Sequence, residues 1–265
     1  MIDFFKQVLE ITAIQIISLF GSFFIFGFVL SKIQASILNN YRRTVGWRGI
    51  LWTAWLGTPV HEYGHAIFAL LFRHKINEVV LFSPDATTGE LGHVNHSYNK
   101  QSFYQSSGNF FIGLAPLILG PLFLVFLLYI LVPQGPEIFR QLSGVQNSLA
   151  ALTAGVGGSL RLLFSLENLK SFYFWIFLYI SFCVASHLAP SKNDIKGAGR
   201  GWWVLVIYLF LFNILAHLFQ WDFTEYIINF SHFFAGLFTV YVYVLIISLV
   251  HFLVSFLILL PWRKY

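Results

Sequence analysis

The chain has 265 residues, of which 57% are apolar and only 10% are charged, whereas soluble domains average roughly 45–50% apolar and about 25% charged residues. This composition excludes an ordinary soluble domain, a disordered chain and a collagen, and it predicts an all-α integral membrane protein. The single Cys183 cannot form an internal disulfide, and the net charge of +5 is typical of basic loops beside lipid headgroups rather than of nucleic-acid binding.

Charge-free windows of about 20 residues mark the expected transmembrane helices. The first window is too long for a typical signal peptide, and no clear small-residue cleavage site follows it, so we expect it to be a retained helix. The windows cover residues 11–31, 49–72, 110–133, 171–191, 201–221 and a stretch near 235–260. The sequence therefore predicts one membrane domain over residues 1–265, with about six transmembrane helices.

Two of the expected connections between these helices are long. In residues 76–98, two β-prone stretches flank a cluster of turn-forming residues, which predicts a short β-hairpin at the membrane surface. Residues 134–170 are rich in Gly, Ser and Ala and too polar to span a membrane. This second connection is either an interfacial helix or a re-entrant piece.

The second window contains the sequence HEYGH at residues 61–65. On a helix, His61 and His65 lie on one face, one turn apart, so the two imidazoles can chelate one zinc ion. Glu62 lies beside them and can take a proton from the attacking water. An acid within a membrane span costs about 2.5–3.5 kcal/mol on insertion scales. A functional site therefore outweighs a purely structural polar cluster.

Zinc requires a third protein ligand, and Asp194 is our first candidate. It follows the fourth window and Pro190, which breaks a helix and can turn the chain inward. One ligating and one catalytic carboxylate would also balance the charge of the ion. The alternative for Asp194 is a solvated acid or a helix cap. In that case the remaining candidate ligands are Glu78, Glu90, His96 and His187.

Two further histidines are candidates for contact with a substrate or an oxyanion. A bend at Pro190 can bring His187 close to the metal, where it would hydrogen-bond substrate or the developing oxyanion. His93 and His96 point to opposite faces of an extended strand, so one of them can contact substrate or donate a proton to the leaving amine. The alternatives are a packing role for His187 and a surface position for the other two.

This set of motifs resembles the site-2-protease family of intramembrane zinc metalloproteases. Its members carry HExxH on one transmembrane helix and, two spans later, Asn-x-x-Pro followed by Leu-Asp-Gly. Here His187 stands in the Asn position and Pro190 is kept. Asp194 supplies the acid, but the residues on either side of it are not the Leu and Gly of the family pattern. The resemblance covers roughly residues 49–200 and is strongest to the compact bacterial members without a PDZ domain.

The resemblance implies a multi-pass zinc metalloendopeptidase of the bacterial inner membrane that cleaves transmembrane protein substrates. His61, His65 and Asp194 would bind Zn²⁺, Glu62 would be catalytic, and the 76–98 hairpin would pair with an unwound substrate segment. A prenyl-protein-processing zinc protease is one alternative, although its Glu-containing third-ligand motif is not found here. The other is a non-proteolytic scaffold or transporter with a buried metal or ion site.

Overall fold

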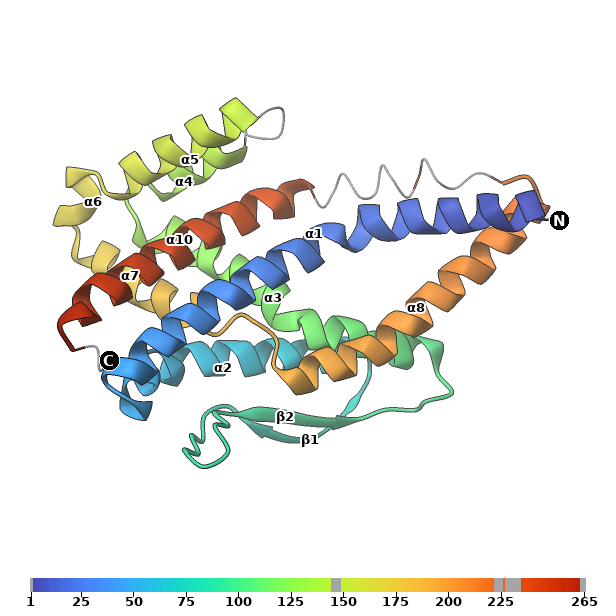
Figure 1. The fold of residues 1–265 in the computed structure, drawn as a ribbon, viewed down its shortest axis with the longest axis horizontal. Helices are drawn as coiled ribbons and strands as arrows, with labels where there is room; N and C mark the ends of the chain where they lie inside the picture. The colour runs from blue at the N-terminus through green and yellow to red at the C-terminus, as the bar shows by residue number, and fades with distance from the viewer. Residues whose placement is uncertain (1, 144–148, 222–225, 227–234, 263–265) are drawn as a thin grey trace.

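The computed structural model describes residues 2–143, 149–221, 226 and 235–262, and this part of the chain is mainly helical (Figure 1). The helices are α1 (Ile2–Thr44), α2 (Trp47–Leu71), α3 (Phe103–Leu131), α4 (Gly135–Ser143), α5 (Leu149–Leu163), α6 (Leu166–Lys170), α7 (Phe172–Ala185), α8 (Lys192–Leu218) and α10 (Ala235–Leu259). A 3-10 turn over Leu260–Trp262 follows α10. The strands are β1 (Lys75–Val80) and β2 (His93–Ser97). The all-α class with one small sheet is as predicted.

Four helices in the described part of the chain are long and apolar enough to cross a membrane, and they are α1, α3, α8 and α10. The sequence predicts six spans, and the difference concerns α2 and α7. Helix α2 has 25 residues, but the polar groups of the HEYGH segment reduce its apolar character. Helix α7 has 14 residues, fewer than the roughly 20 that cross a hydrocarbon core.

The outward faces of the long helices are apolar. Ile17 and Phe28 in α1 are 69% and 63% exposed, and Trp203 and Leu218 in α8 are 64% and 63% exposed. In water, such faces would form large apolar patches. In lipid they need no polar cover, because each helix satisfies its own backbone hydrogen bonds. The fold therefore suits a membrane environment.

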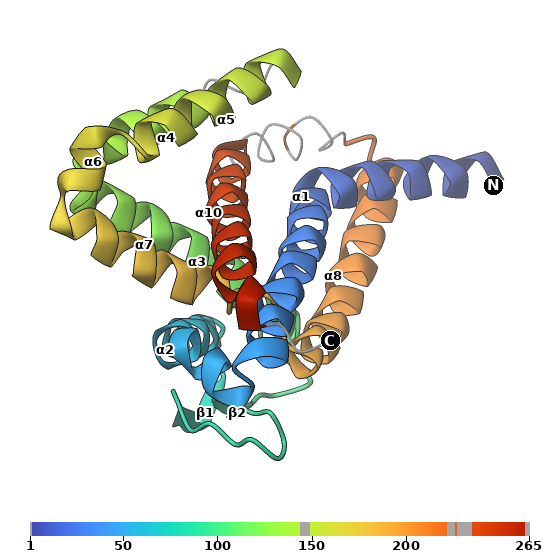
Figure 2. The same cartoon turned by 60° about the vertical axis from the view of Figure 1, so that its left-hand side comes forward.

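The buried core lies where α1, α3, α7 and α10 meet. It contains the buried side chains of Phe23, Leu117, Phe177 and Tyr241. The Tyr241 hydroxyl donates a hydrogen bond of 2.8 Å to the carbonyl of Leu117, which satisfies a buried polar group between α10 and α3. Helices α1 and α10 run side by side, as Figure 2 shows. Helices α2 and α8, which carry the candidate site, pack against α3 of this core.

The connection over residues 134–170 folds into α4, α5 and α6, with residues 144–148 outside the described part. Helices α4 and α5 pack against each other. Both views place them at the end of the molecule away from the β-hairpin (Figures 1 and 2). The expected single interfacial or re-entrant piece is therefore a group of short helices.

The predicted β-hairpin is present. Strands β1 and β2 pair antiparallel, with Val79 opposite Val94 and an irregular register between Ile76 and Glu78. In the turn, the Asp85 carboxylate accepts a hydrogen bond of 2.8 Å from the Thr87 N–H, as expected for an Asx-type turn. Both strands contact α2 (Figure 1). The hairpin therefore lies next to the helix that carries the HEYGH segment.

Candidate metal centre

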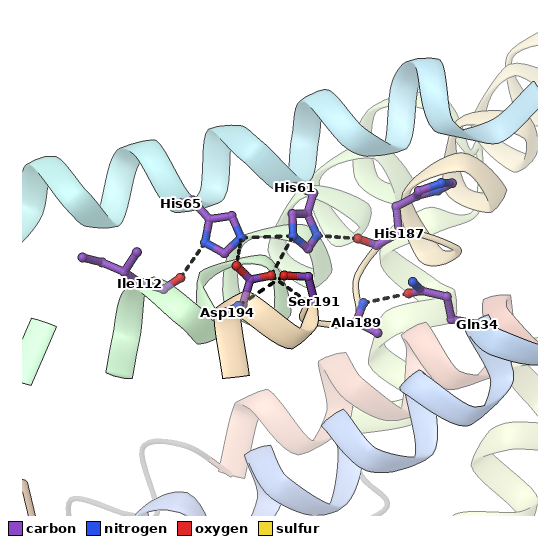
Figure 3. A network of polar contacts seen from close by, with 8 residues as sticks. All are labelled: Gln34, His61, His65, Ile112, His187, Ala189, Ser191 and Asp194. Carbon is purple, nitrogen blue, oxygen red and sulfur yellow. Dashed lines mark hydrogen bonds and ion pairs between the residues drawn. The ribbon is translucent and has the colours of Figure 1, made fainter. Parts of the chain in front are cut away.

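Three side chains from two helices converge on one point (Figure 3). His61 and His65 are one turn apart on α2, and their Nε2 atoms are 3.0 Å apart. The Asp194 carboxylate at the start of α8 lies 3.5 Å from Nε2 of His61 and 3.4 Å from Nε2 of His65. The three ligand atoms lie within 4.8 Å of one another. They can therefore bind a single metal ion.

The outer nitrogen of each imidazole donates to a main-chain carbonyl. Nδ1 of His61 lies 2.6 Å from the oxygen of His187, and Nδ1 of His65 lies 2.7 Å from the oxygen of Ile112. Carbonyl oxygens only accept, so the Nδ1 atoms carry the protons. In the neutral rings, both Nε2 atoms then present lone pairs to each other and to the carboxylate. Metal-binding histidines generally donate such a hydrogen bond from the ring nitrogen that does not bind the metal.

Asp194 is held in place by its own helix. It is the third residue of α8, and Ser191 is the N-cap. The Asp194 N–H donates to the Ser191 hydroxyl at 3.2 Å, and Oδ2 of Asp194 accepts from the Ser191 N–H at 2.6 Å. The capping box fixes the carboxylate while leaving Oδ1 directed at His65. The two alternatives for this acid, a helix cap and a ligand, are therefore compatible.

Two glycines allow the helices around the site to approach closely. A side chain at Gly57 in α2 would collide with the carbonyl of Cys183 in α7. A Cβ at Gly113 in α3 would lie 2.5 Å from the Asp194 carbonyl and 2.7 Å from Cβ of Ala198. Small residues permit such contacts between helices. The second contact sets the position of Asp194 against α3.

A cavity of about 820 Å³ opens onto the three ligands, within the usual size range of ligand sites. Glu62 is 6% exposed and lines this cavity next to the histidines. The chain around Pro190 also lines it, and the Ala189 N–H there donates a 2.7 Å hydrogen bond to the Gln34 side chain of α1. On the other side the cavity is lined by the β-hairpin over residues 88–94.

The ring of His187 is turned away from the metal ligands (Figure 3). Its Nδ1 lies 3.0 Å from the Cys183 carbonyl and 3.2 Å from the Ser186 hydroxyl. Its buried Nε2 has no hydrogen-bond partner among the described residues. The His187 carbonyl orients His61, and His187 also lines the cavity. The expected contact of its side chain with substrate or the oxyanion stays a prediction.

The other candidate ligands lie in a separate group on the hairpin. The imidazole of His93 contacts Glu90 at 2.7 Å and Glu78 at 3.4 Å. Hydrogen bonding to Glu78 and Glu90 raises the pKa of His93 above its ordinary value. His96 lines the cavity, and its Nδ1 lies 2.9 Å from Nδ1 of His74.

Sequence reasoning overlooked His74, Gln34 and the two carbonyls that orient the histidines. No local pattern identifies a main-chain carbonyl as a partner, because every residue has one.

No protein-family model matches the chain, and neither a curated protein nor a solved structure matches it. The geometry of this site is therefore the basis for assigning a function to the chain.

Proposed function

We propose that the chain is a zinc-dependent intramembrane endopeptidase, with the ion held by His61, His65 and Asp194 and with Glu62 as the catalytic acid–base. One observation carries the proposal. When both rings are neutral, two imidazole nitrogens that carry no proton converge with a carboxylate beside a buried glutamate that lines a cavity. A metal ion bound by the three groups would relieve the repulsion among these lone pairs.

The donor set favours zinc over harder ions. Two imidazole nitrogens and one carboxylate oxygen are typical zinc ligands, and three protein ligands leave one position open for chemistry. Calcium and magnesium prefer sites built from oxygen atoms. When bound, zinc would polarise the scissile carbonyl and lower the pKa of the attacking water to about 7.

Glu62 is suited to move the proton. Glu62 lines the cavity, and in the sequence it directly follows His61, the first histidine of the motif. We assign it two steps, in which it takes a proton from the attacking water and then passes it to the leaving amine. General acid–base groups of this kind contribute roughly 10²–10⁴-fold to the rate.

The substrate that fits this setting is a peptide segment of a membrane protein. The long helices are apolar on their outward faces, so a partner in the bilayer can reach the molecule without leaving lipid. A helical segment must unwind before its backbone reaches the ligands. The cavity is lined by His93, Val94 and His96 of β2, which supports docking of the extended segment beside this strand.

The test combines metal content and cleavage in one set of variants. Zinc per protein is measured by mass spectrometry, and cleavage is followed on a synthetic transmembrane peptide in liposomes. Glu62→Gln should keep zinc and lose roughly 10²–10⁴-fold in cleavage rate. His61→Ala should lose both, and His217→Gln, at the far end of α8, should lose neither.

Two results would contradict a peptidase. Cleavage that survives in Glu62→Gln would exclude this glutamate as the acid–base. Metal flux across the liposomes, retained in Glu62→Gln and lost in His61→Ala, would favour the transporter alternative. Comparative proteomics of membranes that contain the wild-type protein or Glu62→Gln would then identify the natural substrates, because uncleaved precursors accumulate with the variant.

A further inference from the structure

His74 and His96 form a pair at the wall of the cavity that the proposed reaction does not use. His74 follows the end of α2, His96 lies on β2, and their Nδ1 atoms are 2.9 Å apart. Nε2 of His74 lies 2.7 Å from the carbonyl of Gln105 at the start of α3. The ring of Tyr98 stacks on His74, with centroids 4.9 Å apart. The pair is thus held by three elements.

Only one arrangement of protons satisfies both hydrogen bonds when the rings are neutral. The carbonyl of Gln105 can only accept, so Nε2 of His74 carries a proton and donates it. Neutral His74 then has a lone pair on Nδ1, which must accept. The hydrogen bond between the rings therefore requires the proton on Nδ1 of His96. Neutral His96 is left with an unprotonated Nε2.

The surroundings keep both rings neutral. His74 is buried, at 4% exposure, and none of the ion pairs found in the described ranges involves either ring. Burial lowers the pKa of His74 below its ordinary value. Burial, together with the neighbouring His74 and His65, lowers the pKa of His96 to about 4. The Gln105 carbonyl favours a positive charge on His74, but burial outweighs it, and no carboxylate pairs with this ring in the part of the chain that the structure describes.

We infer that His96 is a hydrogen-bond acceptor for a backbone N–H of the peptide bound in the cavity, and that His74 is the positioning residue that fixes this role. His96 lines the cavity, and its Nδ1 is committed to His74. Nε2 is therefore the polar atom that the ring can offer to a ligand. The inference rests on the proposed peptidase function and names a substrate contact within it.

This assignment keeps one expected role of His96, contact with substrate, and excludes the other, in which it donates a proton. An unprotonated nitrogen cannot stabilise an oxyanion by hydrogen bonding, and it cannot protonate the leaving amine. It instead selects for a peptide unit that has an N–H at one position. Proline or an N-methylated residue at that position lacks the donor and should be disfavoured.

The first test reads the proton position directly and needs no activity. In ¹⁵N-histidine-labelled protein, NMR distinguishes protonated from unprotonated ring nitrogens, and the His96 signals are assigned by their loss in His96→Gln. We expect His96 to be protonated at Nδ1 in the wild-type protein. In His74→Phe, which removes the acceptor, Nδ1 should lose this preference. A proton on Nε2 of His96 in the wild-type protein would overturn the inference.

The second test locates the contact in the substrate. A series of transmembrane peptides, each N-methylated at one residue around the cleaved bond, is assayed with wild-type protein and with His96→Phe. At one position, methylation should lower kcat/KM roughly two- to tenfold in the wild type and cause no further loss in His96→Phe. In His96→Gln, whose side chain can also accept a hydrogen bond, methylation at that position should again lower kcat/KM in part.

The outcomes separate this inference from the proposed function. If N-methylation and His96→Phe lower kcat/KM independently at every peptide position, His96 accepts no substrate N–H, although the chain is a peptidase. A wild-type protein that cleaves no peptide would refute the peptidase function and the substrate contact with it. The NMR result would in that case still report the tautomers of the two rings.

Discussion

The Nε2 atoms of His61 and His65 lie 3.0 Å apart. Each neutral ring donates its one N–H, at Nδ1, to a main-chain carbonyl, so neither Nε2 atom carries a proton. Two lone pairs at this distance repel each other, and the Asp194 carboxylate, 3.4 Å from His65, adds a negative charge. The arrangement is favourable only when a cation, either a metal or an added proton, lies between the groups. Metal binding and the local fold should therefore be coupled.

The first prediction concerns Asp194→Asn. Loss of the carboxylate should weaken zinc binding by more than the roughly 10- to 100-fold caused by changing a residue that only hydrogen-bonds to a metal ligand, and cleavage should be lost. The amide oxygen can still accept from the Ser191 N–H, so the cap of α8 should survive. Zinc affinity is measured by competition with a chelator, with Glu137→Gln as the control, because Glu137 is a half-buried acid of α4 that pairs with Arg140 and does not line the cavity. Equal affinity in wild type and Asp194→Asn would remove Asp194 from the ligand set.

The second prediction concerns His187→Leu. The carbonyl of His187, and not its ring, contacts His61. Leucine keeps that main-chain carbonyl and removes the buried ring Nε2, which has no hydrogen-bond partner among the described residues. We therefore expect zinc binding to persist and kcat to change less than tenfold. An oxyanion role for the ring would instead cost roughly 10²–10³-fold in kcat. Single-turnover rates with zinc-loaded protein distinguish the two.

The third prediction concerns the contact between α3 and α8. Gly113→Ala places a Cβ 2.5 Å from the Asp194 carbonyl, so α8 must shift and carry the carboxylate away from the histidines. We expect a cost of about 1–3 kcal/mol in stability, as for overpacked cores, and weaker zinc binding. Gly199→Ala in α8 meets no atom within 4 Å and is the matched control. If both variants bind zinc equally well, this contact does not position Asp194.

Local patterns in the sequence predict much of the site and of the hairpin. The spacing of His61 and His65 depends only on the helix repeat, and the hairpin follows from β-prone stretches around turn residues. The acid at position 194 could be proposed because it follows a proline after an apolar stretch. These features depend on a few neighbouring residues, so they can be read without the tertiary structure.

The features that sequence reasoning did not find depend on how distant segments meet. His74 and His96 are 22 residues apart, and their pairing depends on where the hairpin folds back against α2. The carbonyls of Ile112 and His187 can accept hydrogen bonds from His65 and His61 only because α3 and the end of α7 pack against α2. The number of candidate spans differs from the prediction because α7 ends at Ala185, well before the end of its charge-free window, and because the HEYGH segment lowers the apolar character of α2.

The last prediction concerns the stability of the hairpin as pH changes. Hydrogen bonding to Glu78 and Glu90 raises the pKa of His93 above its ordinary value of 6.5. A raised pKa means that this stabilisation is fully present below about pH 6.5 and is lost as pH rises through the folded-state value. Amide exchange in β1 and β2, corrected for intrinsic rates, should therefore be slower at about pH 6 than at about pH 8. His93→Gln should abolish this difference. His96 does not titrate in this range, because its pKa is about 4. A difference that persists unchanged in His93→Gln would assign the effect to another group.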